Sequence, residues 1–155
     1  TKIKQNIMVI QRIQTLFFFF SAILIAVFAF LPALTIQSLE TTYQLGAIYS
    51  GDGVSTKPDI LLLSLSGLIF VLSVIAIFKF KNLKQQMQLC AINIVLTLAL
   101  LLSVAALAFT LKTPTATVEI GLCNLLPLVS IISFAFAYSG IKHDKKLLSD
   151  SNRIR

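Results

Sequence analysis

The chain has 155 residues, of which 57% are hydrophobic and only 12% are charged, and its mean hydropathy is +0.91. A water-soluble domain of this length cannot bury so much apolar surface, so the composition excludes an ordinary soluble fold. The formal net charge of +7 does not form one basic block, because the cations lie in short segments between long apolar runs. We therefore expect a single-domain membrane protein with no nucleic acid partner.

Four apolar stretches are each long enough to cross a bilayer, which takes about 20 helical residues. Helices are expected throughout, since a lone strand would leave its backbone groups unpaired in hydrocarbon. The sequence therefore predicts an all-α membrane protein that consists of one four-transmembrane-helix bundle and a basic tail, 142–155. The predicted spans are residues 13–36, 59–78, 88–111 and 118–141.

Several residues near the ends of these stretches predict local structure. Pro32 falls in the last turns of the first predicted helix, where a missing backbone donor is tolerated. Pro58 and Asp59 suit the start of the second helix, because proline needs no donor there and a carboxylate faces the positive end of the dipole. Glu119 is expected in the first turn of the fourth helix, and Pro127 is expected to bend that helix.

The lysines and arginines predict the orientation of the chain. Eleven of the thirteen fall on one side of the predicted spans, and only Lys57 and Lys112 fall on the other. The positive-inside rule then places both termini in the cytoplasm and the loop 37–58, between the first two helices, outside. Gly51, Asp52 and Gly53 favour a tight turn in this loop, so a small hairpin on the helices is one possible structure.

Small and polar residues within the spans predict packing faces, because helices associate in lipid through close packing and occasional hydrogen bonds. Ser66 and Ser73 are the only such pair in the second helix. The third helix offers Ala99, Ser103, Ala106 and Thr110. The strongest polar candidates, which we expect to make interhelical contacts, are Asn93, Thr97 and Asn124. A neutral path for a solute is the alternative interpretation of these three residues.

The residue types that usually carry chemistry are scarce. His143 is the single histidine and lies in the tail, so no pair of imidazoles is available in the bilayer for haem. Cys90 and Cys123 are predicted near opposite faces of the membrane, which excludes a disulfide or a shared metal. No predicted span carries an ionisable residue in its interior, which argues against proton-coupled transport. We expect no catalytic site, no cofactor and no bound metal.

The tail is basic and is expected to contact either anionic lipid headgroups or a partner protein. The residues predicted to make these contacts are Lys142, Lys145, Lys146, Arg153 and Arg155. Asp144 and Asp150 lie between them.

Two segments of the chain resemble a known family. They are residues 8–16, MVIQRIQTL, and residues 142–155, KHDKKLLSDSNRIR. Both resemble a family of uncharacterised four-helix inner-membrane proteins of Bacteroidota, a domain of unknown function. The resemblance implies a multi-pass protein of the bacterial inner membrane and implies no activity or site residue. Lys145 and Lys146 stand where acidic residues are common in that family.

These observations favour a small non-catalytic protein that acts as an accessory or assembly subunit of a larger membrane complex. Its expected partners are membrane lipids and other integral membrane proteins. A homo-oligomeric transporter or channel for a small solute is the alternative function. A lipid-modifying enzyme is a weaker third option, which substitutions of Asn93, His143 or Asp144 would test.

Overall fold

The computed structural model describes the backbone of residues 2–39, 42–48, 55–79 and 82–153, and the side chains of 13–39, 42–48, 59–79 and 82–150. Four long helices account for most of this part of the chain: α1 (Lys2–Phe30), α2 (Ile60–Phe78), α3 (Leu83–Leu111) and α4 (Leu125–Arg153). The remaining elements are the strands β1 (Pro32–Ser38), β2 (Thr42–Gly46), β3 (Ser55–Pro58) and β4 (Ala116–Ile120), and the short 3₁₀ helix η1 (Leu122–Asn124).

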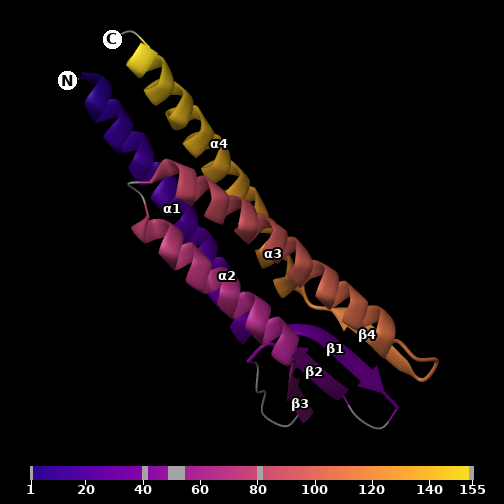
Figure 1. Ribbon diagram of the computed structural model, residues 1–155. Coiled ribbons are helices and arrows are strands. Elements are labelled where there is room, and N and C mark those ends of the chain that lie inside the picture. The colour runs from indigo at the N-terminus through magenta and orange to yellow at the C-terminus, as the bar shows by residue number, and fades with distance from the viewer. Residues whose placement is uncertain (1, 40–41, 49–54, 80–81, 154–155) are drawn as a thin grey trace.

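The helices lie side by side, with the strands gathered at one end and both chain termini at the other (Figure 1). Helix α1 packs against α2 and α4, and α3 packs against the same two helices. Each of the four contains a stretch long and apolar enough to cross a membrane. These features indicate a multi-pass membrane protein.

The buried residues of α2 and α3 recur at alternating steps of three and four. In α2 they are Leu62, Ser66, Ile69, Ser73 and Ala76, and in α3 they are Gln86, Cys90, Asn93, Thr97, Leu100 and Val104. Such a 3.5-residue period keeps one face turned toward a neighbouring helix along its whole length. The Ser66 and Ser73 pair therefore does mark the packing face of α2. The face predicted for α3 is wrong, because Ala106 and Thr110 are exposed.

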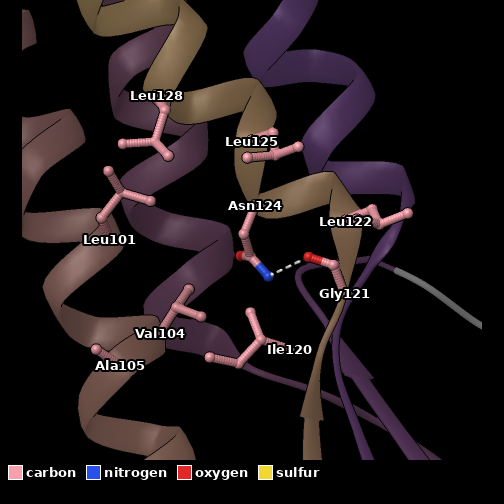
Figure 2. A pocket seen from close by; sticks show the side chains of 9 residues that line it. All are labelled: Leu101, Val104, Ala105, Ile120, Gly121, Leu122, Asn124, Leu125 and Leu128. Atoms are coloured by element: carbon pink, nitrogen blue, oxygen red, sulfur yellow. Dashed lines mark hydrogen bonds between the residues drawn. The ribbon is translucent and has the colours of Figure 1, made fainter.

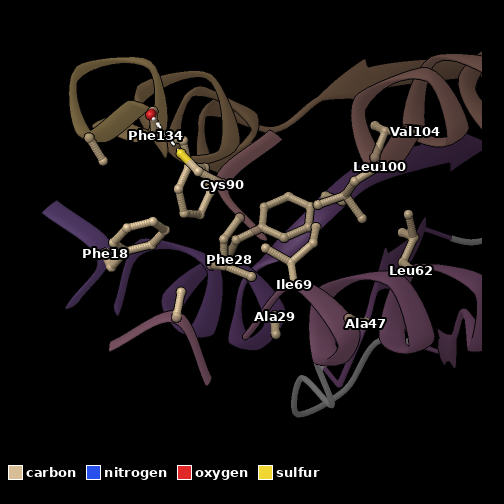
Figure 3. Packing of buried hydrophobic residues seen from close by; sticks show 14 of the residues in the cluster. Phe18, Phe28, Ala29, Ala47, Leu62, Ile69, Cys90, Leu100, Val104 and Phe134 are labelled. Atoms are coloured by element: carbon tan, nitrogen blue, oxygen red, sulfur yellow. Dashed lines mark hydrogen bonds between the residues drawn. The ribbon is translucent and has the colours of Figure 1, made fainter. Parts of the chain in front are cut away.

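Aromatic and aliphatic side chains fill the space between the helices (Figure 3). Phe18 of α1 and Phe134 of α4 are fully buried, and their ring centroids lie 5.9 Å apart. Large apolar side chains also cover the outer surface, where Leu102 is 70% exposed and Phe109 is 80% exposed. Large apolar side chains on the outer surface are expected when the surrounding solvent is hydrocarbon.

The expectation of an all-α fold is wrong, because the connections at the end opposite the termini form a four-stranded sheet of order β3-β2-β1-β4. Strand β1 pairs antiparallel with both β2 and β4, and β2 pairs in parallel with β3. The hairpin in this region is formed by β1 and β2. The tight turn predicted at Gly51–Gly53 lies outside the described residues.

The first helix ends at Phe30 rather than at residue 36, and Pro32 begins β1. Proline has no N–H to donate and its ring clashes with the carbonyl four residues earlier, so the helix ends before it. The strand can continue from there because β2 and β4 supply partners for its backbone, including pairs of Leu34 with Leu45 and with Ile120. A lone strand in hydrocarbon would lack such partners, which is why the sequence predicted a helix up to residue 36.

The fourth helix starts seven residues later than predicted, since residues 116–120 form β4 and α4 begins at Leu125. Glu119 consequently lies in a strand opposite Thr35, not in a first helical turn. Pro127 is the third residue of α4, where backbone N–H groups have no intrahelical partner, so it does not interrupt the helix. At the other end, α4 continues through the predicted tail to Arg153.

Helices α1 and α4 extend beyond the connection between α2 and α3, so the two termini project together (Figure 1). Each of the two contains 29 residues, compared with 19 in α2. At about 1.5 Å per residue, 29 residues span roughly 44 Å, well over the ~30 Å of a hydrocarbon core. We call the projecting parts of α1 and α4 the terminal projection, which on α4 includes the residues Lys142 to Asp150.

Candidate functional site

A buried polar pair joins α1 to α4 at the base of the terminal projection. The side-chain amide nitrogen Nε2 of Gln14 donates a hydrogen bond of 2.5 Å to Oδ2 of Asp144. Asp144 is fully buried, and Gln14 is 2% exposed. The remaining oxygens, Oδ1 of Asp144 and Oε1 of Gln14, have no hydrogen-bond partner among the described residues. The pair therefore contains one hydrogen bond and two further buried acceptor oxygens.

The space for this pair depends on Gly140, one turn before Asp144 on α4. A Cβ atom at Gly140 would lie 3.2 Å from both Cγ and Nε2 of Gln14. The absence of a side chain at this position lets the Gln14 amide lie directly against α4. Gly140 thus allows the approach of helices that brings the two polar side chains together.

Asp144 belongs to the segment predicted as a basic tail, yet its side chain is fully buried. Asp144 continues the buried face of α4, which includes Phe134, Ala137 and Ile141. Gln14 begins the corresponding face of α1, four residues before Phe18. The 3-and-4 spacing was therefore visible in the sequence, but the high local charge around Asp144 obscured it.

The predicted basic contacts lie on another side of the terminal projection. Lys142, Lys145 and Lys146 are all exposed, and with Met87 and Tyr138 they line a groove of about 440 Å³ between α3 and α4. Its lining also includes Ser149 and Asp150, so three lysines face one carboxylate in the groove and an anionic group on a partner or on a lipid fits this excess of positive charge. The side chain of Arg153 and the whole of Arg155 lie outside the described residues.

Two of the predicted polar residues, Asn93 and Thr97, are buried in the middle part of α3. Asn93 of α3 donates through Nδ2 to the hydroxyl of Ser73 on α2, at 3.3 Å. The hydroxyl of Thr97 donates to the carbonyl of Asn93, at 2.7 Å, so its bond stays within α3. Asn93 therefore links two helices, whereas the hydroxyl of Thr97 bonds to the backbone of its own helix.

The third predicted polar residue, Asn124, lies far from these, at the end of the molecule that carries the sheet. Its Nδ2 donates to the carbonyl of Ala33 at 2.7 Å and to that of Gly121 at 2.9 Å. Its contacts are thus with the backbone of β1 and of the β4–η1 link rather than with another helix. The structure does not bring Asn93, Thr97 and Asn124 together.

Both cysteines are free, and each donates to a backbone carbonyl: Cys90 to Phe134 at 3.0 Å and Cys123 to Pro32 at 2.7 Å. The thiols therefore help to hold neighbouring segments together. In the part of the chain that the structure describes, no three His, Cys, Asp or Glu side chains gather closely enough to hold a metal ion.

Comparison with known proteins identifies the family but no relative of known activity. Among curated proteins and among solved structures, no match is found. Residues 10–154 match the model of a domain of unknown function, DUF4293. Since this match covers nearly the whole chain, the protein belongs to the DUF4293 family.

Proposed function

We propose that the protein crosses the bacterial inner membrane four times, with both termini in the cytoplasm, and serves as a non-catalytic accessory or assembly subunit of a larger membrane complex. The terminal projection is the surface through which it binds its partner. The proposal draws support from the charge distribution, since eleven of the thirteen lysines and arginines fall on one side of the predicted spans in the sequence.

The observation that carries the proposal is the continuation of α4 as a helix past Asp144, paired with α1 through Gln14. This surface is preformed, so a partner would not have to order a loose tail on binding. It presents cationic and apolar groups together, because Lys145 and Lys146 are exposed beside Leu147 and Leu148. A partner with an acidic, partly apolar surface at the membrane face matches it.

The packing between the helices supports a role in binding rather than the transport of a solute through a single chain. Phe28, Leu100 and Phe134 are fully or almost fully buried in one cluster, and the central amide of Asn93 is bonded to Ser73. A solute path through one chain would have to displace these side chains. The competing function, a homo-oligomeric transporter or channel, would place its path between copies.

Photo-crosslinking in native membranes tests the proposal. A photoreactive amino acid at Leu148, on the terminal projection, is expected to crosslink the full-length protein to one larger membrane partner. The matched control is Leu102, which is 70% exposed on the apolar surface of α3 and should label lipid. A product from Leu148 that contains only a second copy of this chain would favour the homo-oligomer, and labelling of lipid alone would contradict docking at this surface.

A further inference from the structure

A second site lies at the opposite end of the molecule, where an apolar pocket opens between α3 and the start of α4 (Figure 2). Its volume is about 370 Å³, which is within the range of about 300–1,000 Å³ typical of small-molecule sites. Leu101 and Val104 of α3 form one wall, and Leu125 and Leu128 of α4 form another. Leu122 is 85% exposed at the rim, so the pocket is reached from the surface around the helices.

One polar side chain lines this pocket. Asn124 is only 9% exposed, and its amide nitrogen is used by the carbonyls of Ala33 and Gly121. Both of these groups are acceptors, so the nitrogen must face them and the oxygen must point the other way. Figure 2 shows the amide oxygen turned to the side on which Leu101 and Val104 lie. This oxygen, Oδ1, is buried and has no hydrogen-bond partner.

We propose that this pocket binds a membrane-soluble molecule with an apolar chain and a neutral hydroxyl, whose O–H donates to Oδ1 of Asn124. The apolar chain would lie against Leu101 and Leu128, and the hydroxyl would supply the donor that the buried amide oxygen lacks. A neutral donor is favoured over an ammonium group, because every other side chain in the lining is apolar and a charge there would lose its hydration.

The site also has a fixed polar end. A Cβ atom at Gly121 would lie 2.7 Å from the carbonyl oxygen of Pro32, so the link between β4 and η1 lies directly on β1. Together with the two hydrogen bonds from Nδ2, this contact fixes the position of Asn124. The amide oxygen is therefore preorganised to accept, and a ligand needs to contribute only one donor.

The experiment uses the full-length protein in vesicles of phosphatidylcholine, a lipid whose headgroup has no hydrogen-bond donor and does not compete. The probe is a hexadecanol that carries a diazirine in its chain, and its methyl ether is the matched probe without the donor. After irradiation, we expect the alcohol to label peptides that line the pocket about fivefold or more above the ether, as loss of a hydrogen bond to a buried group predicts.

Two protein variants locate the labelling. Ala105 lines the pocket and Ala106, the next residue, is exposed outside it, so Ala105→Phe should remove the difference between the probes while Ala106→Phe should retain it. Equal labelling of the unaltered protein by the alcohol and the ether would overturn the proposal, since the pocket would then hold only lipid tails. Equal effects of the two substitutions would also overturn it. The comparison of probes does not depend on the folding of either variant.

Discussion

Asp144 and Gln14 together retain two buried acceptor oxygens without a partner in the part of the chain that the structure describes. This geometry predicts that Asp144→Asn is tolerated or stabilising, because the new amide can donate to Oε1 of Gln14. Asp144→Ala should instead lower the free energy of unfolding by about 1–3 kcal/mol, since it leaves Gln14 with no partner on α4.

Thermal unfolding in detergent micelles measures this effect. The fully buried thiol of Cys90 becomes reactive toward a fluorogenic maleimide only when the helices separate, provided that the half-buried Cys123 is first replaced by serine. Asp150→Ala is the matched control, because Asp150 is an exposed carboxylate on the same helix. Equal shifts for Asp144→Ala and Asp150→Ala would show that the buried pair contributes nothing specific.

At the scale of single elements, the start of α2 is the feature that the sequence predicted best. Asp59 is the N-cap, and its Oδ1 accepts hydrogen bonds from the backbone N–H of Leu61 at 2.8 Å and of Leu62 at 3.2 Å. The prediction succeeded because a cap depends on residues within one turn of each other.

Replacement of this cap has a defined expected result. Asp59→Ala should lower the free energy of unfolding by about 1 kcal/mol, and Asp59→Asn, which keeps an acceptor oxygen, should lower it much less. The same thiol-reactivity assay compares the two variants. Equal losses for Asp59→Asn and Asp59→Ala would mean that the charge of Asp59, and not its hydrogen bonds, supports the helix.

The junction of β4 and η1 depends on a glycine in a way that no local sequence pattern shows. Gly121→Ala would place a Cβ 2.7 Å from the backbone oxygen of Pro32, which can move only together with its strand. We therefore expect this substitution to lower the free energy of unfolding by about 1–3 kcal/mol. Gly67→Ala in α2 is the control, because nothing lies within 4 Å of its Cβ and alanine is a better helix former by about 1 kcal/mol. Melting curves of the two variants should shift in opposite directions, and a shared direction would contradict the close approach at Gly121.

At the scale of the whole molecule, the proposed orientation is open to a labelling test. Lys112 and Lys145 are both exposed and lie toward opposite ends of the helices, at the ends of α3 and α4 respectively. In a Cys123→Ser background, a membrane-impermeant maleimide should label Lys112→Cys on intact spheroplasts and Lys145→Cys only after permeabilisation. Reaction of both positions from the same side would contradict four crossings, and exchanged reactivity would reverse the orientation.

Burial across the whole molecule shows how far composition alone could predict the site. Hydropathy located the four helices but did not reveal that Asp144 is buried, because the residues around it in the sequence are mostly basic. Whether a side chain on α4 is buried depends on what α1 places opposite it. The polar residues predicted inside the spans were likewise named individually, while their bonding partners, Ser73 for Asn93 and Ala33 for Asn124, come from other elements.

The sequence by itself determined that the chain has four stretches suited to hydrocarbon and that its cations favour one end, because transfer into lipid and interaction with the interface sum over residues that are adjacent in the chain. Only the tertiary structure decided where α1 and α4 give way to strands, which carboxylate is buried, and which amide oxygen faces the pocket between α3 and α4. Those outcomes depend on groups supplied by segments far apart in sequence. A strand becomes permissible once its backbone has partners, and a polar side chain can be buried once a facing helix makes room for it.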